Sequence, residues 1–244
     1  MENRMIEYLM DFGLTRQEGV IYLVLLSNGE MTGYEVAKIS GISRSNTYNA
    51  LVQLVEKGAA YIDEGESKRY SPVSIREFTK NIIDHLNVKK KYLIDNEPVI
   101  RQKNEGYLTI SGYVHVLDKI RNMIDYAANR IYFSAPISII KKFEENLIER
   151  AKNDVKIVIL TNEEYEIKNG IVYVMKGMEQ IRLIVDTKEV LTGSALKKKD
   201  NVCLYSKNQN LVDLFKEMLR GEIILLEQKY NVEDTVLVTM NKEI

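Results

Sequence analysis

Three helix-start residues, each followed later by a closing glycine, divide residues 15–58 into three short helices. The start and stop residues are Thr15 and Gly29, Thr32 and Gly41, and Ser43 and Gly58. Glu lies three residues after each of the two threonines, the spacing of a capping box that satisfies the free amides of a first turn. Glycine just past the last turn is a common stop. This stretch can therefore fold only as a compact helical module, preceded by a short amphipathic segment at residues 5–12.

The helix predicted from Arg44 to about Lys57 has one apolar face, which should pack on the two earlier helices. Its members are Thr47, Ala50, Leu51 and Leu54. The residues left pointing outward are Arg44, Ser45, Tyr48, Asn49 and Gln53. Two short strands, 59–62 and 68–71, follow around a turn at residues 63–66. This element order is that of a winged helix-turn-helix, which we place at residues 1–73.

A long helix is predicted from Ser74, because the chain then has no Gly or Pro until Pro98. Its apolar residues form one broad stripe, interrupted by Lys89: Ile75, Phe78, Ile82, Leu86, Leu93 and Ile100. Such a stripe is typical of a helix that pairs with a second copy. We therefore predict a linker and dimerisation helix over residues 74–105, and a homodimer.

Strands and helices alternate from Gly106 onward, which indicates an α/β domain over residues 106–244. Strands are predicted at 107–110, 130–133, 155–161, 171–175, 181–185, 190–192 and 202–205, and helices at 113–129, 137–153 and 211–228. Residues 235–240 are predicted to form an edge strand or a frayed tail. The whole chain is therefore expected to be a multidomain α+β protein.

Composition excludes several classes of protein. The chain has 244 residues, 45% of them hydrophobic, which is too apolar for wholesale disorder. Its longest apolar runs, such as residues 20–26, are far shorter than the roughly 20 residues that span a bilayer. The lone Cys203 forms no internal disulfide and no signal peptide is recognisable, so we expect a cytoplasmic protein. No metal-ligand cluster or Gly-rich phosphate loop is present, so neither a metal nor a cofactor is expected.

The amino end of the third helix is the expected DNA-reading end. Arg44 is the strongest candidate for a base contact, because a guanidinium can donate two parallel hydrogen bonds to guanine; Asn49 could pair with adenine. The hydroxyls of Ser43, Ser45 and Tyr48 are candidates for phosphate contacts. Each of three residues could instead have a purely structural role: Ser43 as a helix cap, Tyr48 in packing between helices, and Arg44 as a solvated surface residue.

The wing and the charge balance determine how strongly one copy can bind DNA. Lys68 and Arg69 lie where a wing would meet the DNA backbone or minor groove. The chain has 34 Lys plus Arg and 35 Asp plus Glu. Residues 38–70 contain five basic and four acidic residues, so the local net charge is only about plus one. One module can make few phosphate ion pairs, so we expect binding to need two copies on one double-stranded operator.

Three parts of the sequence resemble the TrmB-like transcriptional regulators. They are the recognition-helix segment at residues 42–58 (ISRSNTYNALVQLVEKG), the wing end at 69–72 (RYSP), and the helix that leads into an α/β domain. The resemblance covers nearly the whole chain. It implies a winged helix that binds operator DNA, a long helix that dimerises, and a phospholipase D-like domain that senses a small molecule, often a sugar. Sugar-binding members usually carry a further C-terminal segment that this sequence lacks, so the implied effector is a sugar or a related metabolite.

Residues 181–186 and 192–194 are similar to the active-site region of phospholipase D, where a His-x-Lys-x-x-x-x-Asp motif supplies a nucleophilic histidine and a lysine that stabilises charge. Aligning Asp186 with the motif's aspartate places Glu179 at the histidine position and Ile181 at the lysine position. Neither can replace the catalytic residue, so the resemblance implies a sensor domain without catalytic activity. Glu179, Asp186 and Ser194 are the candidates for its effector pocket.

Two other functions stay open at this point. A phospholipase D-like phosphodiesterase would need a basic nucleophile beside Asp186 and Ser194, and the only histidines are His85 and His115. The second alternative is an effector-independent winged-helix interaction or nucleoid module, which would have no enclosed pocket in its C-terminal domain.

Overall fold

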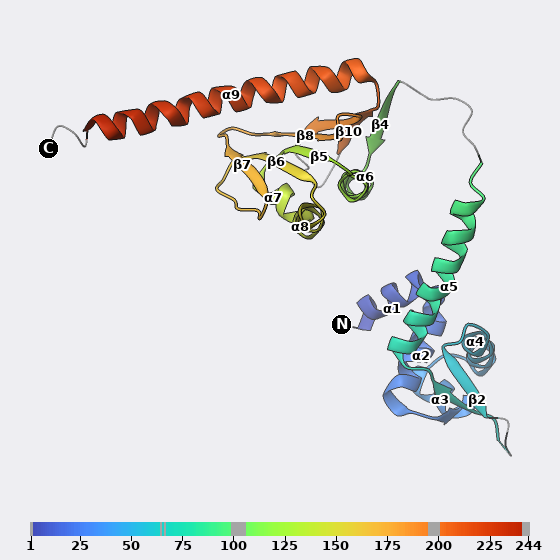
Figure 1. Ribbon diagram of the computed structural model, residues 1–244. Helices are drawn as coiled ribbons and strands as arrows, with labels where there is room; N and C mark the ends of the chain where they lie inside the picture. Colours follow the sequence, from blue (N-terminus) through green and yellow to red (C-terminus); the bar gives the residue numbers. More distant parts are fainter. Residues whose placement is uncertain (1, 64, 66, 99–105, 195–200, 241–244) are drawn as a thin grey trace. The chain divides into compact units, whose positions relative to one another are not determined.

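The computed structural model describes residues 2–63, 65, 67–98, 106–194 and 201–240. The chain divides into two compact units, residues 1–100 and 101–244 (Figure 1). The first is a winged helix-turn-helix that ends in a long helix, and the second is a mixed α/β domain, which confirms the predicted fold class.

Four helices build the body of the first unit: α1 Glu2–Asp11, α2 Arg16–Asn28, α3 Gly33–Ser40 and α4 Arg44–Glu56. The predicted starts are confirmed. Thr15 and Thr32 each form a complete capping box, with Glu18 and Glu35 respectively, and Ser43 caps α4. These local hydrogen bonds set the boundaries of the helices because they satisfy amides that would otherwise lack a partner.

A three-stranded antiparallel sheet forms the wing, where the sequence predicts only a hairpin. Its strands are β1 Met31–Thr32, β2 Ala60–Asp63 and β3 Arg69–Pro72, in the order β1-β3-β2. Met31 pairs with Tyr70. A strand of two residues is too short to show alternation in a sequence, so β1 could not be predicted.

The long helix α5 spans Ile75–Asp95 and is shorter than the predicted 74–105; residues 99–105 lie outside the described part of the chain. Its first turns pack on the winged helix, where Phe78 is buried and Ile82 half-buried. Every described residue from Ile83 to Pro98 is exposed. The carboxyl half of α5 therefore carries apolar side chains that its own unit does not cover.

Tyr22 connects the helical body to the junction between wing and long helix. Its ring is fully buried 5.5 Å from that of Phe78, and its hydroxyl donates to the carbonyl of Val73 at 2.7 Å. Tyr22→Phe would leave that carbonyl without its donor, so we expect the free energy of unfolding to fall by about 1–2 kcal/mol in urea titrations. Tyr61→Phe is the matched control, because Tyr61 is exposed and its hydroxyl donates to the exposed side chain of Glu77. Equal losses in the two variants would contradict this role.

The same contact predicts a pH dependence. Burial, reinforced by the charge of Glu77, raises the pKa of Tyr22 to about 12. Because the folded state favours the neutral phenol, this contribution to stability is complete below about pH 10 and is lost as the pH rises through 12. Tyr22→Phe should flatten that alkaline decline.

A seven-stranded mixed sheet forms the second unit, in the order β4-β10-β9-β8-β5-β6-β7. Strands β5, β6 and β7 are parallel, and the other pairs are antiparallel. The strand bounds are β4 Tyr107–Ser111, β5 Arg130–Ser134, β6 Lys156–Thr161, β7 Gly170–Val174, β8 Gln180–Val185, β9 Glu189–Ser194 and β10 Val202–Ser206. All seven predicted strands are present, with ends shifted by a few residues.

Helices cover the two faces of this sheet unequally (Figure 1). One face packs against α6 Tyr113–Asp125, α7 Ile137–Ile140 and α8 Glu144–Lys152 and holds the larger core. The other face packs against the single helix α9 Gln209–Met240, through Val212 and Leu219 among others. The face under α9 has a groove beside the helix.

Three predictions for the helices were wrong in detail. The helix expected over 137–153 is interrupted by a short 3₁₀ segment, Lys141–Phe143, which places Phe143 in the core with its ring 6.0 Å from Phe133. The helix expected over 113–129 ends at Asp125. Residues 235–240, expected as an edge strand or a frayed tail, are instead the end of α9, because no Gly or Pro follows Gly221 and a helix satisfies its own backbone.

Candidate nucleic-acid interface and effector groove

Helix α4 leaves its polar face exposed because its apolar face is buried in the core of the winged helix. Thr47, Ala50, Leu51 and Leu54 are buried, as predicted from their spacing. The Ser43 hydroxyl accepts the Asn46 amide at 3.4 Å, which is the capping role foreseen for it. The side chains that remain exposed on the first turns are Asn46 and the five DNA-contact candidates Ser43, Arg44, Ser45, Tyr48 and Asn49. The structure therefore gathers the DNA-contact candidates of this helix on one exposed surface.

Arg44 is held in place by an aromatic ring that the sequence reading missed. Its guanidinium lies 4.7 Å from the ring centroid of Tyr34, which is 51% exposed at the start of α3. Stacking on a ring leaves the edge N–H groups of a guanidinium free to donate hydrogen bonds. The sequence holds one indication of this contact, which is the aromatic residue directly after Thr32 and Gly33 at the helix start.

Tyr48 combines the two roles considered for it. A Cβ added to Gly33 would come 2.5 Å from the Tyr48 ring, so the ring packs directly on the start of α3. The side chain is nevertheless 43% exposed. A side chain at residue 33 would therefore force the Tyr48 ring to move from this position.

The cations near the wing are partly neutralised. Arg69 lies 3.4 Å from Glu30, whose other carboxylate oxygen accepts from Ser71. Lys68 is exposed just before β3. Away from this surface, Lys57 donates to the buried carboxylate of Glu18 at 2.7 Å. One of the five basic residues counted between 38 and 70 therefore stabilises the fold, and the local positive charge is smaller than the sequence count implies.

The three predicted effector-pocket residues do not lie together. Gln180 pairs with Ser194 at one end of the β8–β9 hairpin, beside Glu179, whereas Asp186 lies in the turn at the other end. The six residues of β8 separate Glu179 from Asp186, and seven steps of extended chain span about 23 Å. Ile181 is fully buried in the core. The expectation of one pocket formed by Glu179, Asp186 and Ser194 was therefore wrong, because the motif runs along the length of a strand.

Asp186 serves as an anchor for the turn. Its carboxylate accepts the backbone amides of Ala128, Asn129 and Arg130 at 2.7–2.9 Å. Burial raises the pKa of Asp186, but these amides outweigh burial and hold the pKa below its usual range. Asp186 and Thr187 have positive φ, as the central residues of a tight hairpin turn do. The interaction ties the β8–β9 turn to the start of β5.

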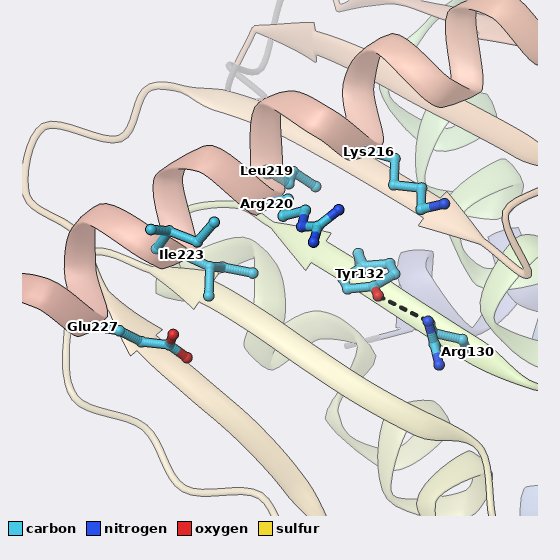
Figure 2. Close-up of a pocket in the computed structure, with 8 residues that line it drawn as sticks. Arg130, Tyr132, Lys216, Leu219, Arg220, Ile223 and Glu227 are labelled. Carbon is cyan, nitrogen blue, oxygen red and sulfur yellow. Dashed lines mark hydrogen bonds between the residues drawn. The ribbon is translucent and has the colours of Figure 1, made fainter.

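A groove of about 410 Å³ lies between α9 and the start of β5 (Figure 2). Its lining residues are Arg130, Tyr132, Lys216, Leu219, Arg220, Ile223, Ile224 and Glu227. The sequence reading missed this groove, since only the fold brings β5 and α9 together. The one indication of the groove in the sequence is that Lys216, Arg220 and Glu227 are spaced so as to lie on one side of a helix.

The described residues give no indication of a metal site, a membrane-spanning helix or a reactive cysteine. Among them, no group of His, Cys, Asp and Glu is arranged to hold a metal ion, and no helix is long and apolar enough to cross a membrane. Burial raises the pKa of the Cys203 thiol to about 11, as for a core residue rather than a reactive thiol.

These features define a class of protein: a DNA-binding regulator with a winged helix, a long helix and a separate α/β domain. The chain belongs to the TrmB family of transcriptional regulators. Residues 9–76 match "Sugar-specific transcriptional regulator TrmB", and residues 107–221 match "Transcriptional regulator TrmB, EBD N-terminal subdomain".

The chain is also similar to other proteins. The chain is 27% identical to the uncharacterized protein YrhO of Bacillus subtilis, over 93% of this chain and 87% of that protein. It is 26% identical to the HTH-type sugar sensing transcriptional regulator TrmBL1 of Pyrococcus furiosus, over 66% of this chain but only 48% of that protein. The phospholipase D family member Nuc of Salmonella typhimurium is similar to 48% of this chain, covering 93% of Nuc, at 18% identity and a TM-score of 0.37.

Proposed function

We propose that this TrmB-family regulator binds a specific operator as a homodimer and changes its affinity when a small molecule binds the C-terminal domain. The observation that carries the proposal is the exposed polar start of α4, where Arg44 is held over Tyr34 and its neighbours offer hydroxyl and amide groups. Such a surface suits the major groove, where base edges present distinct donors and acceptors. As a regulator of transcription it would act in the cytoplasm.

Two copies are needed because one copy has few phosphate contacts. Lys57 is held by Glu18, and Arg69 is 3.4 Å from Glu30. The number of neutralised phosphates sets both the non-specific affinity and its salt dependence. We therefore expect weak binding by a single module and a shallow salt dependence per copy.

Helix α5 supplies the proposed dimer seam. Leu86 and Leu93 are 56% and 68% exposed, and both lie on the uncovered half of the helix. They are seven residues apart, which places them on one face of the helix. Pairing of two such faces would bury this apolar surface and fix the distance between the two α4 helices.

The C-terminal domain is the proposed sensor. It matches the family's EBD subdomain, and a relative is named as sugar sensing. A ligand that binds one arrangement of the dimer better than another shifts the population toward it. We propose that this shift resets the spacing of the two recognition helices, and with it operator affinity.

Arg44→Ala tests the role of the recognition helix. On a duplex that carries the operator, selected as described in the Discussion, we expect the variant to lose about 1–3 kcal/mol of binding free energy in fluorescence anisotropy. On a scrambled duplex the loss should be much smaller. The control is Arg121→Ala, since Arg121 lies in α6 of the other unit. Equal losses on both duplexes would make Arg44 a phosphate contact, and no loss would remove it from the interface.

The two alternative functions gain no support from the geometry. A phosphodiesterase needs a nucleophile and a cation around one phosphate, but Ile181 is in the core and Asp186 is held by three amides. His85 lies in α5 and His115 in α6, so neither is on β8 or β9. An effector-independent nucleoid module would show no sequence preference, and the DNA selection at the end of the Discussion distinguishes it.

A further inference from the structure

We propose that the groove between α9 and β5 binds a small organic phosphate whose remaining part carries hydroxyl groups. This inference rests on the proposed function, since it names the chemical class of the effector. It also assigns residues to the effector site: Arg130, Lys216 and Arg220 for the phosphate, and Glu227 for hydroxyl groups. All of them line the same groove (Figure 2).

The three cations of this groove have no close carboxylate partner among the described residues. Among the described residues Lys216 makes no ion pair, and the nearest acid to Arg220 is the exposed Glu217 at 3.9 Å. Arg130 donates instead to a neutral group, the Tyr132 hydroxyl, at 3.2 Å. Three like charges around one concavity repel one another, and a bound anion would relieve that repulsion.

The cations come from two elements that the fold holds together. Lys216 and Arg220 are neighbours one turn apart on α9, and Arg130 lies on β5 across the groove. In Figure 2 their head groups surround the Tyr132 ring from both sides of the groove. Arg130 also lines an adjoining groove of about 270 Å³ together with Lys156, which places a further cation nearby. Guanidinium and ammonium groups in this arrangement suit the several oxygens of a phosphate.

The opposite end of the groove has different chemistry. Glu227 lies away from the cations (Figure 2), and its carboxylate accepts the Tyr173 hydroxyl at 2.6 Å. This hydrogen bond, with burial, raises the pKa of Tyr173 to about 12, so the phenol stays neutral at neutral pH. A carboxylate has further lone pairs, which can accept from ligand hydroxyls. The helical rise places Glu227 about 10 Å from Arg220 along α9.

The floor between the two ends is apolar. Leu219 is buried and Ile223 half-buried, and both line the groove. A groove of about 410 Å³ with an apolar floor and a few polar groups at its ends has the size and composition of small-molecule sites. A neutral sugar would leave the three cations without a counter-charge, whereas a phosphorylated one would satisfy both ends.

Isothermal titration calorimetry of the full chain without DNA tests this site. The probes are glucose 6-phosphate, fructose 6-phosphate and glycerol 3-phosphate, with glucose and inorganic phosphate for comparison. We expect at least one of the three esters to bind more tightly than either comparison compound. Lys216→Met and Arg220→Met should each raise the dissociation constant of that ester roughly tenfold. Lys152→Met is the charge-matched control, because α8 covers the opposite face of the sheet.

The outcomes separate this inference from the proposed function. Binding of none of the three esters, equal binding of glucose, or unchanged affinity in both variants would overturn the site and leave the DNA-binding proposal intact. Inorganic phosphate binding as tightly as the esters would overturn the role of Glu227. Ester binding by a protein that selects no DNA sequence would support the site and refute the proposed function.

Discussion

Replacing Leu86 and Leu93 with aspartate should make the protein monomeric and lower its affinity for a duplex with two half-sites by about 100-fold or more. Both side chains are exposed on one face of α5, where buried aspartates would repel each other across a paired seam. Each module of a dimer raises the effective concentration of the other, so loss of the dimer removes that gain. Sedimentation velocity measures the oligomeric state, and fluorescence anisotropy measures the affinity.

A matched variant separates seam disruption from general damage to the helix. Val88 is 70% exposed on the opposite side of α5, so Val88→Asp should leave dimer and affinity unchanged. A Leu86→Asp/Leu93→Asp protein that remains dimeric would show that the seam lies elsewhere. A monomer that binds as tightly as the unmodified protein would show that two copies are not needed.

Glu222→Ala should lower the free energy of unfolding of the C-terminal domain by about 3–5 kcal/mol. Glu222 on α9 accepts from Arg182 at 2.6 Å, and Arg182 is only 5% exposed in the middle of β8. The other end of the Arg182 guanidinium donates to Ser134 at 3.0 Å. Removal of the carboxylate would leave the buried Arg182 without its ion-pair partner, which is far more unfavourable than the loss of an exposed pair.

Urea titrations followed by circular dichroism measure this effect. The transition that Tyr22→Phe does not shift reports the C-terminal domain. Glu217→Ala is the control: its contact with Arg220 is 3.9 Å long and exposed, so the change should stay within about 0.5 kcal/mol. Arg182→Met/Glu222→Leu should recover most of the stability, because an apolar pair needs no counter-charge. A loss below about 1 kcal/mol for Glu222→Ala would show that water reaches Arg182.

The sequence predicted best those parts of the molecule that short-range interactions determine. The starts of α2, α3 and α4 follow from cap residues and their neighbours three positions on, and the buried face of α4 follows from helical spacing. These signals act within one helical turn, so they can be read without the fold.

The parts that failed depend on contacts between distant segments. The groove cations Arg130 and Lys216 meet only because α9 crosses β5, and Arg44 meets Tyr34 only because α3 packs on α4. Asp186 was grouped with Glu179 and Ser194 because a motif was aligned by residue type, whereas its carboxylate is held by the amides before β5, at the other end of the hairpin. A motif gives residue types in order, but the direction of a strand decides which of them can share a site.

Selection of bound sequences from random double-stranded DNA by the purified protein tests the central claim most directly. We predict enrichment of a motif with two similar half-sites, whose centres lie about one helical turn of DNA apart or a multiple of that distance. Repeating the selection with Arg44→Ala should weaken the motif at defined positions. Recovery of DNA with no enriched motif would contradict the account of a sequence-specific dimeric regulator.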